Sequence, residues 1–276
     1  MELTILGGRG FIGTHYRSLF PYRVSNGRDD YHVVTKDVLY FISTVHNYNV
    51  FTQPHLDIDT NLSTLIDVLE SWRAHPDSKN GVFNFVSSWF VYGQQDQPHG
   101  VPETAECHPK GFYSITKRCA EQLLMSYCET YGLKYRILRL GNVVGPGDLK
   151  VSAQKNALQH IIGQMKRHEV VQIYGDGKFF RDYIYVTDCV KAINLAITKG
   201  AENAIYNIGN GKPWLFYDII VYLHERMKSM SEVVHITPKE FHRAVQVWSC
   251  YLDNTKIQAL GYVPEYTGAK LYDALI

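Results

Sequence analysis

The chain has 276 residues, long enough to bury the core of one large α/β domain or two smaller ones. Its 28 Lys and Arg residues nearly balance 27 Asp and Glu residues, so it lacks the basic field that attracts nucleic acid or anionic membranes. Hydrophobic residues make up 45%, which argues against disorder. We therefore expect a globular protein whose partner is a small molecule.

The cysteines form neither a disulfide framework nor a zinc motif, because they are odd in number and include no Cys-x-x-Cys. We expect no metal and a reducing cytoplasm. The sequence starts directly with a short apolar strand and contains no run of 18 apolar residues, so we expect no targeting segment and no membrane span.

Strand and helix patterns alternate along the first half of the chain. Residues 3–6, 37–43, 82–87 and 135–140 read as buried strands, and residues 11–20, 61–74 and 113–131 read as helices, with Gly132 as a stop signal. This alternation predicts the α/β class, with a doubly wound parallel sheet of the Rossmann type. After Gly141 the pattern changes, which predicts a smaller C-terminal substrate lobe. We assign residues 1–143 and about 183–209 to the dinucleotide domain, and about 144–182 and 210–276 to the lobe.

A glycine loop follows the first strand and opens the first helix. It fits both Gly8-x-Gly10-x-x-Gly13 and Gly7-x-x-Gly10-x-x-Gly13. Either spacing gives a tight turn and a helix N-terminus that favours a pyrophosphate, so a dinucleotide is expected here.

The second strand should end near Ser25, where an acidic residue would select NAD and a cation would select NADP. Arg9 and Arg28 favour NADP, whereas Asp29 or Asp30 would favour NAD. Including the Tyr113 and Lys117 discussed below, the predicted cofactor contacts are Gly7, Arg9, Gly10, Phe11, Ile12, Gly13, Ser25, Asn26, Arg28, Tyr113 and Lys117.

Tyr113 and Lys117 lie one helical turn apart at the entry of a predicted helix. A nearby ammonium, helped by an oxidised nicotinamide, would lower the tyrosine pKa and make the phenol an acid or base near neutral pH. Ser88 ends a predicted strand upstream and could orient the reacting oxygen. The chain has two other Tyr-x-x-x-Lys spacings, at 174–178 and 266–270, but the first spans Gly-Asp-Gly and the second lies near the C-terminus, so both read as chance.

The chain resembles the extended short-chain dehydrogenase/reductase family of NAD(P)-dependent sugar-nucleotide epimerases and dehydratases. The resemblance covers nearly the whole chain and rests on Gly-Gly-x-Gly-Phe-Ile-Gly at 7–13, Ser-Ser-x-x-Val-Tyr-Gly at 87–93, Tyr-x-x-x-Lys at 113–117, Leu-Arg-Leu-Gly-Asn-Val-Val-Gly-Pro-Gly at 138–147, Ile-Tyr-Gly-Asp-Gly-x-x-x-Arg-Asp-Tyr at 173–183, Tyr-Asn-Ile-Gly at 206–209 and Leu-Asp-Asn-Thr-Lys at 252–256.

This resemblance implies roles for particular residues. Ser88 and Tyr113 would be catalytic, and Lys117 would tune Tyr113 and bind the nicotinamide ribose. A nucleotide-diphosphate sugar would be held by Ser88, Asn142, Arg181 and Arg243; a structural ion pair between Arg181 and Asp182 is the alternative. A homodimer through helices 61–74 and 113–131 is also implied.

The sequence differs from the family pattern in two places, and these differences limit the activities that the resemblance implies. Ser88-Trp89-Phe90 stands where dehydrating members carry Thr-Asp-Glu, so the resemblance implies no dehydratase activity. The segment between Val24 and Asp37 is short, which predicts the loss of one strand with its helices. The sequence thus predicts a sugar-nucleotide 4-epimerase or 4-ketoreductase; the alternative is a non-catalytic dinucleotide-binding regulatory or interaction protein.

His46 and Tyr48 follow the strand at 37–43. They would either donate a second proton, shape the sugar site or merely line a loop.

Overall fold

The computed structural model describes residues 2–21, 24–25, 30–95, 99–149, 151–153 and 155–276. A six-stranded sheet lies at its centre, and all its neighbouring strands run parallel. In spatial order the strands are β10 (Ala204–Ile208), β5 (Tyr135–Leu140), β4 (Phe83–Ser88), β3 (Val38–Tyr40), β1 (Thr4–Leu6) and β2 (Val24–Ser25).

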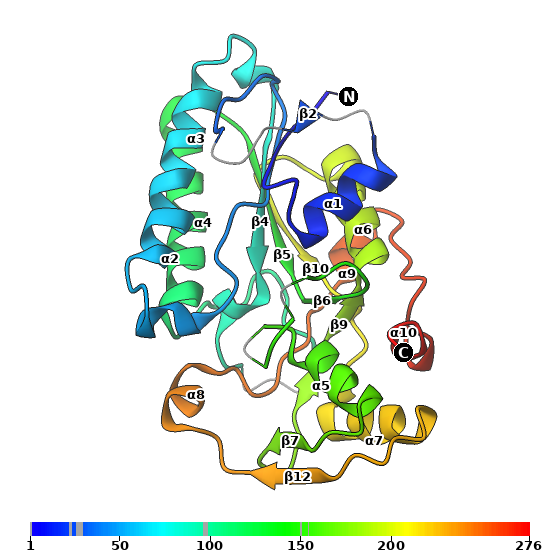
Figure 1. The fold of residues 1–276 in the computed structure, drawn as a ribbon. Coiled ribbons are helices and arrows are strands. Elements are labelled where there is room, and N and C mark those ends of the chain that lie inside the picture. Colours follow the sequence, from blue (N-terminus) through cyan, green and yellow to red (C-terminus); the bar gives the residue numbers. More distant parts are fainter. Residues whose placement is uncertain (1, 22–23, 26–29, 96–98, 150, 154) are drawn as a thin grey trace.

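Helices cover both faces of this sheet (Figure 1). On one face α1 (Phe11–Leu19) and α6 (Val186–Lys199) pack on a core that includes Leu3 and Ile5. On the other, α3 (Thr64–Arg73) and α4 (Phe112–Tyr131) bury Leu6. The predicted doubly wound Rossmann architecture is confirmed.

The predicted elements are present, with two shifts at their ends. The strand predicted at 37–43 pairs only from Val38 to Tyr40. The helix predicted from residue 61 begins as a π-helical turn, η2 (Asp59–Ser63), after the short α2 (Leu56–Ile58). The predicted stop at Gly132 is confirmed, because this residue adopts the left-handed conformation at φ 63° and ψ 38°.

The connection from β2 to β3 contains no helix or further strand in its described part, residues 30–37, as the short spacing predicts. This segment is tied to β1 instead, where the Oγ1 atoms of Thr35 and Thr4 lie 2.8 Å apart. Val33 fills space under α3 and is 3% exposed. The threonine pair and one buried apolar side chain thus attach this segment to β1 and to the core under α3.

The second half of the chain adds a third apolar cluster beyond the sheet, formed chiefly by α5, α7 and β7. The strands outside the central sheet form three pairs. These are β6 (Asn142–Val144) with β9 (Tyr183–Tyr185), β7 (Val171–Tyr174) with β12 (Val233–Ile236), and β8 (Phe180–Arg181) with β11 (Trp214–Leu215). The remaining helices of the described residues are α5 (Ala157–Lys166), α7 (Phe216–Arg226), α8 (Glu240–Val245), α9 (Thr255–Gln258) and α10 (Ala269–Asp273), and their 3-10 turns are η1 (Asn47–Phe51), η3 (Ser78–Asn80) and η4 (Trp89–Tyr92).

Asp182 ties together the segments at residues 210–211 and 252. Its carboxylate is 2% exposed and accepts hydrogen bonds from the backbone amides of Asn210, Gly211 and Leu252. Within the described ranges no helix has the length and apolarity needed to cross a membrane.

Candidate active site

The glycine loop has the geometry of the Gly7-x-x-Gly10-x-x-Gly13 spacing. Gly7 has a φ of 76°, and a Cβ there would lie 2.9 Å from the Ile42 amide nitrogen. A Cβ on Gly13 would lie 2.7 Å from the Gly7 carbonyl oxygen. Neither position tolerates a side chain, so the backbone itself forms the surface of the turn.

This turn leads directly into α1, whose N-terminus has no side-chain cap and no acidic residue in its first turn. Its free amides and positive dipole end suit an anion, so these residues fit a dinucleotide pyrophosphate. Arg9 is exposed beside the turn, and Phe11 and Ile12 are partly buried. Ser25 pairs through its backbone with Ile5. The side chain of Ser25 and the predicted contacts Asn26 and Arg28 lie outside the described residues.

Ser88 and Tyr113 come together at the carboxyl end of β4. Ser88 is the last residue of the strand, and its Oγ accepts a hydrogen bond from the Phe90 amide at 3.3 Å. Tyr113 stands in the first turn of α4, and both residues are 8% exposed. Burial raises the pKa of Tyr113, hydrogen bonding with Ser88 and Ser43 opposes this, and the Asp57 charge raises it further.

Lys117 lies one turn further along α4 and is 2% exposed. Its Nζ donates to the Val86 carbonyl oxygen at 2.8 Å and lies 4.1 Å from the centre of the Phe85 ring. Burial lowers the pKa of Lys117 to about 7, although the Glu121 carboxylate raises it.

The expected lowering of the Tyr113 pKa by Lys117 is therefore wrong for the chain by itself. Desolvation moves both groups toward their neutral forms, because a buried site disfavours a phenolate and an ammonium alike. A protonated Tyr113 can give a proton to a substrate oxygen.

A buried polar cluster that the sequence did not reveal holds this pair in place. Asn61 is 2% exposed and donates to Oγ1 of Thr116 in α4 at 2.9 Å, while its carbonyl accepts from Ser43 and from the Thr44 amide. Asn47 fixes the start of α4, where its Oδ1 accepts from the Ser114 amide at 3.3 Å. In the sequence, the only indication of this cluster was the presence of asparagines at positions 47 and 61, inside helical or loop segments.

Asp57 belongs to the same cluster and is fully buried. Its Oδ1 accepts hydrogen bonds from Thr44 and Asn49, whereas its Oδ2 has no partner among the described atoms. The charge of this carboxylate adds to the effect of burial in raising the pKa of Tyr113. Burial lowers the pKa of His46, and the charge of Asp57 opposes that change. It therefore reinforces the protonated form of the tyrosine.

Arg181 is a buried cation without a carboxylate partner in the described part of the chain. Its guanidinium donates to the carbonyl oxygens of Phe180 and Trp248 and lies over the rings of Trp89 and Phe179, at 5.7 and 4.5 Å. The alternative of an ion pair with Asp182 is wrong, because that carboxylate is occupied by three backbone amides. A buried, uncompensated guanidinium favours binding of an anion.

The other two predicted substrate residues differ in their surroundings. Asn142 begins β6 and donates from its side-chain amide to the Asp182 carbonyl oxygen at 3.2 Å. Arg243 lies exposed on α8, and its side chain has no hydrogen-bond or ion-pair partner among the described residues. The structure therefore brings Asn142 next to the strand of Arg181 but shows no contact between the two arginines.

The helix α8 bridges the two halves of the molecule. The Tyr48 hydroxyl, in the loop after β3, lies 2.8 Å from Nδ1 of His242, and Phe241 packs on Phe51 at a ring distance of 4.5 Å. His242 also packs on Tyr174 at 4.3 Å. Tyr48 is therefore a bridging residue in this structure, and its hydroxyl already has a partner.

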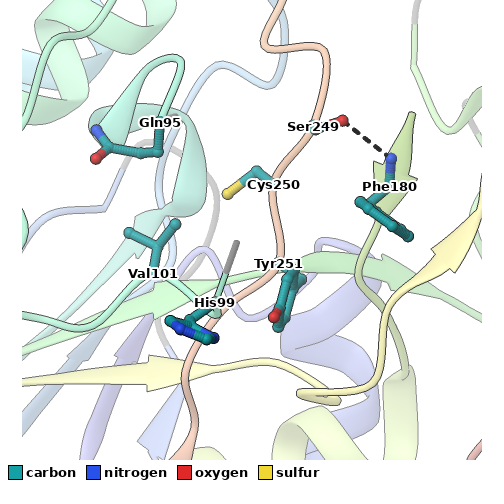
Figure 2. Close-up of a pocket in the computed structure, with 7 residues that line it drawn as sticks. All are labelled: Gln95, His99, Val101, Phe180, Ser249, Cys250 and Tyr251. Atoms are coloured by element: carbon teal, nitrogen blue, oxygen red, sulfur yellow. Dashed lines mark hydrogen bonds between the residues drawn. The ribbon is translucent and has the colours of Figure 1, made fainter. Parts of the chain in front are cut away.

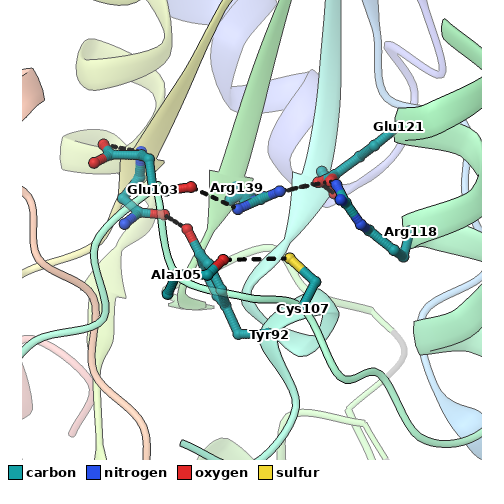
Figure 3. A network of polar contacts seen from close by, with 9 residues as sticks. Tyr92, Glu103, Ala105, Cys107, Arg118, Glu121 and Arg139 are labelled. Atoms are coloured by element: carbon teal, nitrogen blue, oxygen red, sulfur yellow. Dashed lines mark hydrogen bonds and ion pairs between the residues drawn. The ribbon is translucent and has the colours of Figure 1, made fainter. Parts of the chain in front are cut away.

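Figure 3 shows a polar network in which Glu121 of α4 meets Arg139 of β5. Glu121 and Arg139 are 0% and 1% exposed and form two hydrogen bonds of 2.9 and 2.7 Å. Ser87 donates to Glu121 at 2.6 Å, and Arg118 adds a bond of 2.8 Å from the edge. This network joins α4, which carries Tyr113, to strands β4 and β5.

Figure 2 shows a small pocket beside β8, where the Phe180 amide donates to Oγ of Ser249 at 3.2 Å. Burial raises the pKa of its Cys250 thiol to about 12, so this thiol is no nucleophile near neutral pH. The pocket is lined by Gln95, His99, Val101, Phe180, Ser249, Cys250 and Tyr251.

The two rival tyrosine–lysine spacings do not form comparable sites. Tyr174 ends strand β7. Lys270 lies 4.8 Å from the centre of the Tyr266 ring, over its face. Over the described ranges, no group of three or more His, Cys, Asp or Glu side chains could hold a metal ion.

Residues 35–209 match the model of the NAD dependent epimerase/dehydratase family. A relative from Methanocaldococcus jannaschii, named "Putative UDP-glucose 4-epimerase", is 27% identical over 95% of this chain and 93% of its own. A dTDP-glucose 4,6-dehydratase from Xanthomonas campestris is 26% identical over 83% of this chain and 68% of its own. A UDP-glucose 4-epimerase from Thermotoga maritima, solved with UDP-glucose, is 26% identical with a TM-score of 0.86, covering 100% of this chain and 96% of that one.

Proposed function

Since the chain belongs to the NAD-dependent epimerase/dehydratase family, a group of extended short-chain dehydrogenases/reductases, we propose that it transfers hydride at carbon 4 of a nucleotide-diphosphate sugar. The net reaction is 4-keto reduction or 4-epimerisation. The pairing of Ser88 with Tyr113 at the end of β4 carries this proposal, because a protonated phenol beside a hydroxyl can bind and protonate one substrate oxygen.

In this proposal each residue has one task. Tyr113 exchanges a proton with the oxygen on carbon 4, and Ser88 hydrogen-bonds the same oxygen. Lys117 binds the nicotinamide ribose. Arg181 takes the diphosphate, for which its uncompensated buried charge is suited, and Asn142 with Arg243 completes the grip on the nucleotide sugar.

The bound cofactor supplies or accepts the hydride, and we propose NADP over NAD. Arg9 supports this choice, because it is an exposed cation in the glycine turn and would attract a 2′-phosphate. Calorimetry of NADP and NAD binding tests it: Arg9→Ala and Arg28→Ala should weaken NADP binding and leave NAD binding unchanged. Unchanged NADP affinity in both variants would remove the charge argument.

We also propose a homodimer formed through α3 and α4. Apolar side chains are exposed on these helices at Ile66, Phe112, Ile115, Leu123 and Tyr131. Such a row of apolar groups is suited to pairing with a second copy. Sedimentation would show the dimer, and Ile115→Glu should shift it toward monomer.

Dehydration does not fit the site, because Trp89 and Phe90 provide no acid or base. This holds although a dTDP-glucose 4,6-dehydratase is among the relatives. The proposal therefore keeps reduction and epimerisation and leaves out elimination.

Tyr113→Phe tests the chemistry, with Tyr266→Phe as the matched control from the rival tyrosine–lysine pair. Removing the phenol should lower kcat/KM about 10²- to 10⁴-fold, as expected for a lost general acid. Equal turnover by Tyr113→Phe and the parent would make the assignment wrong. Cofactor binding without binding of any nucleotide sugar would favour the non-catalytic alternative.

A further inference from the structure

His242 of α8 lies close to the buried cation Arg181. Its ring packs on the ring of Trp248 at 5.7 Å, and the guanidinium of Arg181 donates to the carbonyl oxygen of the same Trp248. In the described part of the chain, neither side chain forms an ion pair with a carboxylate. An imidazole and an uncompensated guanidinium thus share one neighbour.

Two further contacts fix the position of His242. Its Nδ1 lies 2.8 Å from the Tyr48 hydroxyl, and its ring packs on Tyr174 of β7 at 4.3 Å. The other ring nitrogen, Nε2, has no hydrogen-bond partner among the described residues. The ring is therefore held in place by aromatic neighbours. The charged residues of its own segment are exposed, and they are Lys239, Glu240 and Arg243.

The charge of His242 depends on the charge beside it. Burial lowers the pKa of His242 to about 4, and the charge of Arg181 contributes to this lowering. The imidazole is therefore neutral at neutral pH in the free protein. A diphosphate that joins a nucleoside to a sugar carries two negative charges, one more than the guanidinium balances. When it binds at Arg181, the field at His242 changes sign, and a negative field favours the imidazolium form.

We propose, on the basis of the function proposed above, that His242 is a proton-linked binding residue, which takes up a proton from water when the diphosphate of a nucleotide sugar binds at Arg181. The proton goes to a ring nitrogen, and no bond of the ligand breaks. The guanidinium and the imidazolium then face the two charges of the diphosphate. The second cation exists only while the ligand is bound, so the free protein does not bear the cost of two neighbouring cations away from water.

Protonation of His242 is compatible with the position of α8. A neutral imidazole accepts from the Tyr48 hydroxyl or donates to it, according to its tautomer, whereas an imidazolium donates from both nitrogens. The contact of 2.8 Å between Tyr48 and Nδ1 therefore persists, with the hydroxyl oxygen as acceptor. The proton adds charge to the site and leaves the helix in its place.

Calorimetry on the full-length protein with saturating NADP⁺ measures the proton uptake. The probes are the uridine, thymidine, guanosine, cytidine and adenosine diphosphate conjugates of glucose, which lack the ionisation near pH 6 of a terminal phosphate. The conjugate that binds is titrated in two buffers of different ionisation enthalpy, because the difference in heat gives the number of protons taken up. We expect about half a proton or more per ligand at about pH 5, and binding about threefold to tenfold tighter there than at about pH 8.

Variants assign the proton to His242. His242→Gln keeps a polar group near Tyr48 but cannot take up a proton, so the uptake should disappear and the affinity should lose this dependence on pH. The matched control is His235→Gln, an exposed histidine of β12, which should keep the uptake. A second readout needs no nucleotide sugar. In nuclear magnetic resonance, the ring signal that is missing in His242→Gln should titrate at higher pH in Arg181→Met than in the parent. Thermal melting at each pH verifies that the variants are folded.

Binding of a conjugate without proton uptake, or the same uptake in His242→Gln and the parent, would overturn the inference while leaving the proposed function intact. An unchanged titration of the His242 signal in Arg181→Met would also overturn it, because the guanidinium would then not act on the ring. Binding of none of the conjugates would refute the proposed function itself.

Discussion

The buried ion pair between Glu121 and Arg139 gives the sharpest test of how the active-site helix is held. Arg139→Met keeps most of the side-chain length but leaves the Glu121 carboxylate with only Ser87 and the edge residue Arg118. Because both members of the pair are at most 1% exposed, water cannot replace the lost bonds. Removing one partner of such a pair costs about 3–5 kcal/mol of unfolding free energy.

Urea unfolding followed by circular dichroism measures this cost as a shift of the midpoint at constant slope. The control is Arg73→Met, because the pair that Arg73 forms with Glu70 lies on the surface and should contribute little. In the double variant Glu121→Gln/Arg139→Met no buried carboxylate remains, and the charge of Arg118 is partly exposed, so it should be more stable than Arg139→Met alone. If Arg139→Met shifts the midpoint no more than Arg73→Met does, the buried pair does not stabilise the fold as we reason.

The pH dependence of this effect has a definite sign. Burial alone would raise the pKa of Glu121, but Arg139, Ser87 and Arg118 together hold it below its ordinary value of 4.5. A carboxyl group with a lowered pKa stabilises the folded state above 4.5, and this contribution is lost as the pH falls through the folded pKa. The stability difference between the parent and Arg139→Met should therefore shrink in acid.

Three further predictions concern the site. Lys117→Met should raise the urea midpoint at pH 6, because the folded-state pKa of Lys117, about 7, lies below its ordinary value of 10.5. Burying the charged ammonium costs its full free energy below pH 7, and this cost fades as the pH rises to 10.5. The stability gain of the variant should therefore disappear at high pH, and a gain that stays constant with pH would contradict this. Arg181→Met should weaken nucleotide-sugar binding, measured by calorimetry, by about 10- to 100-fold without weakening cofactor binding. If cofactor binding is weakened instead, Arg181 contacts the cofactor and not the sugar diphosphate. Tyr48→Phe should speed hydrogen exchange in α8 and raise the KM for the sugar nucleotide more than it lowers kcat, and unchanged exchange would show that the bond to His242 does not hold this helix.

Local sequence chemistry determined much of the fold. The glycine loop, the strand at 135–140, the helix at 113–131 and its stop at Gly132 depend on turn residues and periodicity within short windows, so they were predicted correctly. The placement of Ser88 at a strand end follows from the same patterns. The choice between two glycine spacings required the backbone angle of Gly7.

Long-range packing decided the rest. Burial in the assembled core raises the pKa of Tyr113 and lowers the pKa of Lys117, so it favours the neutral form of both. The spacing of the two residues in the sequence does not predict this burial. The bond between Tyr48 and His242 joins residues 194 positions apart. Arg181 has no carboxylate partner among the described residues, and the neighbouring Asp182 carboxylate accepts from backbone amides instead. Local patterns were enough to place Ser88 and Tyr113 at the sheet edge. Their pKa shifts and their neighbours depend on the packed fold, because distant segments of the chain exclude water from the site.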